Sequence, residues 1–276
     1  MLPPNHELVI EADRTEQQYW RDLWNYRELF YFLAWRDVLV RYKQTIVGVA
    51  WSLIRPLMTM AVFVVVFGKF AGLPSEGVPY PILVFAALLP WQFFSNALSE
   101  CGTSLVSNSN LISKVYFPRL VVPASAVITS FVDFLISAVF LALLMAFYRF
   151  ALSWRICALP LFILLAFAAA LGGGLWLAAL TVQYRDVRIV IPFIVQFGFF
   201  ISPVGYSSSV VSGEWRLLYS LNPMVGVIDG FRWSIQAGHQ PLYWPGIFLA
   251  IASISALLVG GIWYFRKTER SFADVI

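Results

Sequence analysis

The sequence predicts an all-α integral membrane protein. We expect six transmembrane helices, an N-terminal amphipathic helix at the membrane interface, and short re-entrant helices between spans five and six. Two observations carry this prediction. Hydrophobic residues make up 60% of the 276 residues and charged residues 12%, whereas a soluble domain is about half apolar and about a quarter charged. The apolar residues also gather in six runs, each long enough to cross about 30 Å of hydrocarbon as a helix.

The N-terminal segment, residues 1–45, is predicted to be cytoplasmic and to contain the amphipathic helix. Between Gln17 and Lys43, large residues recur at three- and four-residue steps, as at Trp20, Trp24 and Tyr31. Aromatic rings and arginines at this spacing are typical of a helix lying in the headgroup region. The alternative is a short soluble helix that packs on the rest of the chain.

The transmembrane domain is predicted over residues 46–266, followed by a cytoplasmic tail over 267–276. Only helices or closed barrels can span lipid, and these runs are too uniformly apolar for barrel strands, which alternate over about ten residues. The predicted spans are Ile46 to Ala71, Pro81 to Val106, Leu120 to Tyr148, Ile156 to Val182, Val187 to Val204 and Tyr243 to Phe265.

The distribution of basic residues predicts the orientation. With both termini inside, 14 of the 19 Lys and Arg residues fall in inside segments and five in outside segments. This excess favours cytoplasmic termini, because basic residues concentrate on the cytoplasmic side.

The longest outside connection, Ser207 to Leu242, is too apolar for a free loop. We expect one or two short helices that dip into the outer leaflet. Asn222 and Pro223 are predicted to start one of them, with Asn222 as the cap and Pro223 in the first turn.

Small residues and prolines mark special positions within the spans. Gly172 to Gly174 and Gly260-Gly261 are interpreted as patches that let helices approach closely. Prolines within the spans should kink or end regular helix; these are Pro56, Pro90, Pro192 and Pro203.

Several classes of site are disfavoured by what the sequence lacks. The two histidines, His6 and His239, lie outside the spans, so a zinc site and a Ser-His hydrolase are not expected. Acidic residues are scattered singly, and no phosphate-binding loop is present. We therefore expect no catalytic residue, no bound metal and no nucleic-acid partner. The cysteines, Cys101 and Cys157, are interpreted as packing residues.

Charged residues inside the spans are costly, so they point to function or to structural pairing. Asp133 lies near the middle of the third span, Glu100 in the second and Arg55 near the start of the first. Each could line a hydrated pathway. The alternative is a satisfied structural partner for Asp133 and Glu100, and snorkelling to the interface for Arg55.

Aromatic residues make up 17% of the chain, and many are explained by the interfacial belt. One subset clusters around Pro90 and Pro203 instead. Flat rings suit the faces of sugar rings, so we hypothesise a substrate channel lined by Trp91, Phe93, Phe94, Phe199, Phe200, Tyr206 and Asp133. Packing or belt positions are the alternative.

Several motifs resemble one family. Trp35-Arg36-Asp37 and Arg41 to Thr45 follow the aromatic helix, the stretch Asn108 to Arg119 joins spans two and three, and Leu221 to Met224 lies in the last outside segment. Together these look like the type-2 ABC transporter permeases that export polysaccharide, such as O-antigen, capsule or teichoic acid. The resemblance covers about residues 20 to 270.

The resemblance implies a homodimer of this chain with two copies of a separate ATP-binding subunit, which binds the ATP and Mg²⁺; this chain binds no cofactor. The dimer interface forms the channel in the bacterial inner membrane. The substrate is a glycan on a lipid carrier, commonly undecaprenyl diphosphate, and O-antigen is the leading candidate. The amphipathic helix and the connection between spans two and three dock on the ATPase. The candidates for coupling ATP hydrolysis to transport are therefore Arg36, Asp37, Arg41, Lys43, Lys114 and Arg119.

Two other functions stay open. A type-2 permease for a drug or another small lipophile would need a drier and narrower cavity with fewer aromatic residues. A membrane enzyme of lipid-carrier metabolism would need a cluster of acids at one membrane face, and the sequence shows none.

Overall fold

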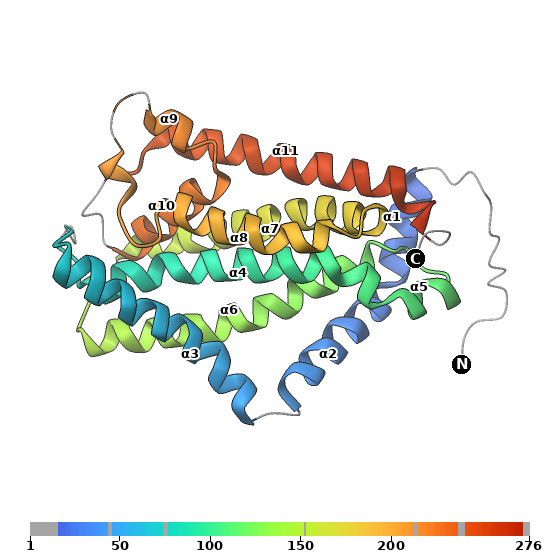
Figure 1. The fold of residues 1–276 in the computed structure, drawn as a ribbon, viewed down its shortest axis with the longest axis horizontal. Helices are drawn as coiled ribbons and strands as arrows, with labels where there is room; N and C mark the ends of the chain where they lie inside the picture. Colours follow the sequence, from blue (N-terminus) through green and yellow to red (C-terminus); the bar gives the residue numbers. More distant parts are fainter. Residues whose placement is uncertain are drawn as a thin grey trace.

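The computed structural model describes residues 16–43, 46–73, 77–151, 153–211, 213, 215–236 and 241–272. The start of the predicted segment 1–45 and the end of the tail 267–276 therefore lie outside the described residues. Over the described residues the chain is helical and forms no strand (Figure 1). The α-helices are α1 (Glu16–Asn25), α2 (Arg27–Lys43), α3 (Ile46–Phe63), α4 (Tyr80–Ser107), α5 (Ser109–Lys114), α6 (Val121–Phe147), α7 (Leu159–Gln183), α8 (Val187–Ile201), α9 (Trp215–Tyr219), α10 (Pro223–Ile235) and α11 (Trp244–Glu269).

Three shorter segments extend or connect these helices. A π-helix, η1 (Val64–Phe70), continues α3, and a 3₁₀ turn, η2 (Trp154–Ala158), leads into α7. A second 3₁₀ turn, η3 (Ser208–Val210), follows α8.

Five helical stretches in the described residues are long and apolar enough to cross a membrane, close to five of the predicted spans. They are Ser52–Phe70, Tyr80–Ser107, Val121–Phe147, Trp154–Gln183 and Trp244–Glu269. In Figure 1 the long helices run side by side, with α4 in the middle of the bundle. In the apolar stretch of α4, 78% of the residues are buried within the chain. The reason is that α4 contacts α3, α6, α7, α8 and α10.

The predicted fifth span differs from the observed helix. Val187 to Val204 was expected to be helical, but α8 has 15 residues and ends at Ile201. Ser202 adopts an extended conformation (φ −89°, ψ 149°), as a residue before proline prefers, so Pro203 ends the helix. At about 1.5 Å per residue α8 is shorter than the roughly 30 Å hydrocarbon core, so a sixth crossing stays a prediction.

The predicted single N-terminal helix is two helices, α1 and α2, separated at Tyr26. The two segments have different partners. The Arg266 guanidinium near the end of α11 lies over the Tyr19 ring of α1, 4.5 Å from its centroid. Helix α2 instead contacts α3 and α6 and buries Leu33 and Ala34. The chain changes direction at Tyr26, between the contact of α1 with α11 and the contacts of α2 with α3 and α6.

The contact of α1 with the end of α11 places both at one end of the bundle, beside α5 (Figure 1). The helices α9 and α10 lie at the opposite end. This arrangement agrees with a common side for the N-terminal segment and the tail, although which side is cytoplasmic stays a prediction.

Helix α10 starts at the predicted cap. The Asn222 side chain accepts a hydrogen bond from the Met224 amide at 3.0 Å, and Pro223 occupies the first helical position. The helix packs against α4, α7 and α11 and is largely buried. How deep it sits in a membrane, and so its re-entrant character, stays a prediction.

The predicted glycine patches are close helix contacts. A Cβ atom added at Gly172 of α7 would lie 2.7 Å from the backbone nitrogen of Leu258 in α11. A Cβ atom added at Gly174 would lie 2.5 Å from the Cys101 sulfur of α4. Helix α7 therefore approaches both neighbours closely, and only glycine fits at these positions.

We expect Gly172→Ala to destabilise the protein by about 1–3 kcal/mol, because the new methyl group meets backbone rather than a movable side chain. The matched control is Gly260→Ala, whose Cβ atom would lie 3.3 Å from the Trp176 side chain. Thermal unfolding of the purified protein in detergent measures both. Equal unfolding midpoints for the two variants would contradict the close contact.

Candidate functional site

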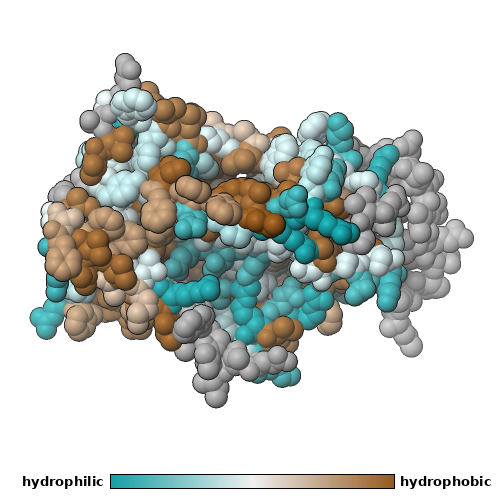
Figure 2. Space-filling model, viewed as in Figure 1, coloured by the Kyte–Doolittle hydropathy of each residue, from teal (hydrophilic) through white to brown (hydrophobic). Residues whose placement is uncertain are grey.

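A polar cavity lies between α2, α3, α4 and α6. Its volume is about 620 Å³. Figure 2 shows hydrophilic residues gathered over the middle of this face, beside apolar surface at the end where α3 and α4 meet η1. The cavity is lined by Arg41, Ser52, Arg55, Pro56, Thr59, Leu89, Gln92, Phe93, Asn96, Glu100, Ser130, Asp133, Phe134 and Ser137.

Three helices each present a polar stripe to this cavity. The stripe of α4 has a four-residue step, at Gln92, Asn96 and Glu100. Residues three and four apart lie on one face of a helix, so each stripe faces one way. The stripes of the other two helices have steps of three and four residues and are Ser52, Arg55 and Thr59 on α3 and Ser130, Asp133 and Ser137 on α6.

The spacing of these stripes was the sequence signal that could have identified the cavity. The sequence prediction used only the charged members Asp133, Glu100 and Arg55, taken one at a time. The structure brings all three to the same cavity.

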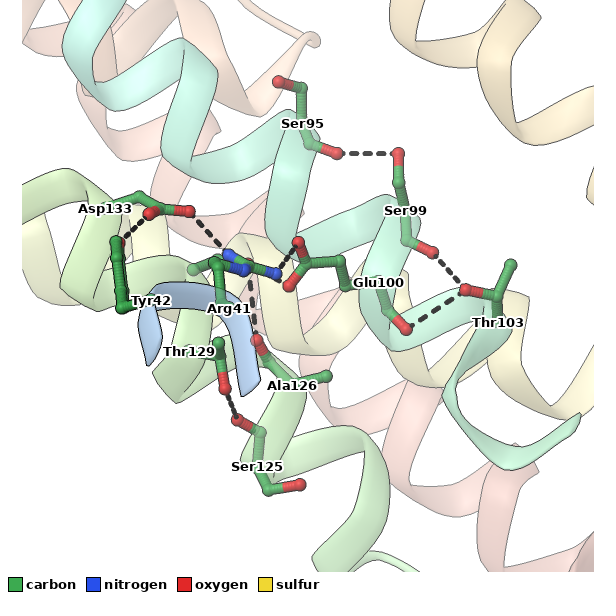
Figure 3. A network of polar contacts seen from close by, with 11 residues as sticks. Arg41, Tyr42, Ser95, Ser99, Glu100, Thr103, Ser125, Ala126, Thr129 and Asp133 are labelled. Carbon is green, nitrogen blue, oxygen red and sulfur yellow. Dashed lines mark hydrogen bonds and ion pairs between the residues drawn. The ribbon is translucent and has the colours of Figure 1, made fainter. Parts of the chain in front are cut away.

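Arg41 of α2 bridges the two carboxylates of the cavity (Figure 3). Its Nη1 atom donates to Asp133 Oδ2 of α6 at 2.6 Å, and its Nη2 atom donates to Glu100 of α4. Ser130 Oγ also donates to Glu100, at 2.9 Å. One cation thus joins the N-terminal helix to two membrane helices, which agrees with the structural alternative for Asp133 and Glu100.

Tyr42 completes this network from the next position of α2, where its hydroxyl donates to Asp133. Burial, followed by the hydrogen bond to this carboxylate, raises the pKa of Tyr42, so the hydroxyl remains a donor. Burial lowers the pKa of Arg41, but the charges of Glu100 and Asp133 outweigh it and raise the pKa. Arg41 is therefore a fixed cation.

Hydroxyl groups along α4 bond to their own helix. Ser99 donates to the Ser95 carbonyl at 2.8 Å, Thr103 to the Ser99 carbonyl at 3.0 Å and Ser107 to the Thr103 carbonyl at 3.1 Å. This pattern satisfies the hydroxyls in an apolar surrounding. They are therefore accounted for by local bonding, unlike the amides of the cavity.

The aromatic candidates for the channel occupy different environments. Trp91 and Phe93 are buried within the single chain. Trp91 packs against Phe94 and Phe199, whereas Phe93 packs against rings of α6 and α7. Phe200 is 66% exposed. A channel role stays a prediction for the whole set, and among these residues only Phe200 is widely accessible in the single chain.

Tyr206 lies in the segment that follows α8. Its hydroxyl shares a hydrogen bond with the Tyr219 hydroxyl of α9 at 2.9 Å. Its carbonyl accepts a hydrogen bond from Arg232. These contacts fix the residue at the end of the bundle opposite α1.

The coupling candidates divide into paired and exposed residues. Arg36 donates to Asp37 at 2.7 Å and to Asn108 at 3.0 Å. The backbone amide of Arg119 donates to the Glu269 carboxylate at the end of α11 at 2.8 Å, and the Arg119 guanidinium donates to the Glu269 carbonyl. Arg41 faces the cavity. The exposed candidates are Lys43 and Lys114.

Within the described ranges, no three or more His, Cys, Asp and Glu side chains are grouped so as to hold a metal ion. The two carboxylates of the cavity, of Glu100 and Asp133, both form ion pairs with the Arg41 guanidinium.

Residues 28–235 match the family described as "ABC-2 type transporter". The chain is 28% identical over 259 residues to the O-antigen export system permease protein RfbA of Myxococcus xanthus, covering 93% of this chain and 98% of that protein. Identity to RfbA of Klebsiella pneumoniae is 23%, covering 90% and 95%. Identity to the polysialic acid transport protein KpsM of Escherichia coli is 20%, covering 85% and 91%.

Proposed function

The chain belongs to the ABC-2 type transporter family, and from this premise we propose that it is the transmembrane subunit of an ATP-driven exporter of lipid-linked polysaccharide, with O-antigen as the cargo. One observation carries the proposal: the similarity to two proteins named as O-antigen export permeases extends over 90% or more of each chain. The likeness to a polysialic acid transport protein supports the broader class of polysaccharide cargo.

The proposed assembly is a homodimer in the bacterial inner membrane with both termini cytoplasmic, joined by two copies of a separate ATPase that binds ATP and Mg²⁺. The absence of a phosphate-binding loop from the sequence supports a separate ATPase. The glycan is carried on undecaprenyl diphosphate. A permease for a drug or another small lipophile is less well supported, because the cavity of this chain is lined by charged and amide side chains.

Deleting the gene in its own bacterium tests the function. We expect O-antigen to disappear from the cell surface and lipid-linked glycan to accumulate on the cytoplasmic side, with restoration by the wild-type gene. Immunoblotting of lipopolysaccharide and extraction of carrier-linked glycan measure both. Unchanged surface O-antigen would exclude the proposed cargo, and a loss of drug tolerance alone would favour the lipophile permease.

Lys114 offers a test of coupling. It is exposed at the end of α5 and has no ion pair with another described residue. We expect Lys114→Glu to weaken co-purification of the ATPase about tenfold, equal to about 1.4 kcal/mol, because the charge of a docking surface is reversed. Export should fall while the unfolding temperature is unchanged.

The matched control for this prediction is Lys69→Glu, an exposed lysine in η1 at the opposite end of the bundle. It should leave the association unchanged. If the Lys114→Glu variant and the wild type co-purified the ATPase equally well, α5 would not be part of the docking surface.

A further inference from the structure

The cavity contains hydrogen-bonding groups that the described chain does not satisfy. The amides of Gln92 and Asn96 and the hydroxyl of Ser137 line it, and none of them bonds to another described residue. Each amide offers two donors and a carbonyl acceptor. An amide left unpaired in an apolar surrounding is costly, so these groups require water or a polar ligand.

The charges of the cavity balance. It holds two guanidinium groups, of Arg41 and Arg55, and two carboxylates, of Glu100 and Asp133. Arg41 is engaged by both carboxylates. An anionic ligand would meet the carboxylates and a cationic one the guanidinium groups, so the lining matches an uncharged ligand with many donors and acceptors.

Four residues contribute the apolar part of the lining, namely Pro56, Leu89, Phe93 and Phe134, and the two phenylalanine rings are largely buried. Phe93 and Phe134 belong to the wall, with their ring centroids 5.6 Å apart. A pyranose ring has hydroxyls at its rim, which suit amides, and C–H groups, which tolerate contact with an apolar wall. The volume of about 620 Å³ lies within the roughly 300–1,000 Å³ of small-molecule sites.

We propose that this cavity is a binding site for sugar residues of the exported glycan, held through their hydroxyls by Gln92, Asn96 and Ser137. The site lies between α2, α3, α4 and α6 of one chain. It deepens the proposed function and rests on it.

The test measures sugar binding without the lipid carrier. The probe is a set of short O-antigen oligosaccharides, freed of lipid by mild acid treatment of lipopolysaccharide from the same strain. The purified full-length chain in lipid nanodiscs is titrated with them and followed by saturation-transfer NMR. We expect Gln92→Leu combined with Asn96→Leu to weaken binding at least tenfold, because two hydrogen-bonding amides are lost together.

The matched control is Gln196→Leu, which removes an exposed amide of α8 outside the cavity lining and should leave binding unchanged. Thermal unfolding of each variant monitors the fold, and Asn96→Ala serves as the milder variant, with a smaller loss in the same direction. Equal binding by the wild type and the double variant would overturn the site.

The failures of the two proposals are distinguishable. Absence of oligosaccharide binding to the wild-type chain, in a strain whose O-antigen export depends on the gene, would overturn the sugar site and leave the export function intact. Normal O-antigen export by the deletion strain would overturn the function itself, and the sugar site with it.

Discussion

Replacing Arg232 with Met is expected to destabilise the protein by at least about 3 kcal/mol, since three carbonyl groups would lose their donor at about 1–3 kcal/mol each. Arg232 lies in α10 and is 5% exposed. Its guanidinium donates to the carbonyls of Leu83 at 3.1 Å, Val204 at 2.8 Å and Tyr206 at 2.7 Å. It therefore joins α10 to α4 and to the non-helical segment after α8, whose polar backbone must be satisfied within the protein.

The fraction of monodisperse protein after detergent extraction, together with its unfolding temperature, measures this loss. Arg232→Lys should recover only part of the stability, because one ammonium group cannot reach three carbonyls in the geometry of the guanidinium fork. Arg216→Met is the matched control at the same end of the bundle. It removes a guanidinium that lies over the Tyr243 ring at 4.1 Å and should cost about 1 kcal/mol or less. Equal losses for Arg232→Met and Arg216→Met would contradict the role of the buried arginine.

For Arg41→Met we expect a loss of about 2 kcal/mol, because Glu100 and Asp133 would remain without their cation. The side chains are 30%, 32% and 16% exposed, so the effect lies between the 3–5 kcal/mol of a broken buried pair and the 0–1 kcal/mol of a surface pair. Thermal unfolding in detergent provides the measurement.

A rescue variant separates charge from packing in this prediction. Arg41→Met combined with Glu100→Gln and Asp133→Asn removes the uncompensated carboxylates and should regain most of the lost stability. Arg36→Met is the control on the same helix, since its guanidinium pairs with the adjacent Asp37 at a partly exposed position. No recovery in the triple variant would show that the Arg41 side chain acts through packing alone.

The spans and the start of α10 could be predicted because their signals are local. Long apolar runs predict membrane helices whatever their neighbours, and Asn222 followed by Pro223 predicts a capped helix start. The end of α8 also had a local signal, because Pro203 was predicted to kink or end the helix, although the span itself was drawn up to Val204.

The partners of Arg41 and the directions of the aromatic rings could not be predicted from the sequence. The first half of α4, up to Trp91, has no polar stripe, so its periodicity does not separate a ring facing the core from one facing lipid or a channel. Spacing groups polar residues into stripes, but it does not identify which helices face one another. That information lies in contacts such as that between Arg41 and Asp133, 92 residues apart in the chain.

The sparse packing of α3 makes this helix sensitive to the bilayer itself. Only 6% of the residues in the apolar stretch of Ser52–Phe70 are buried within the chain, against 78% in that of α4. Tilting α3 therefore disrupts little of the protein's own core, and lipid tails or a neighbouring chain supply most of the resistance. A helix adapts to a thinner or thicker hydrocarbon layer mainly by changing its tilt. Membrane thickness should accordingly reposition α3 before it affects α4, and with α3 it should move the wall of the cavity formed by Ser52, Arg55 and Thr59.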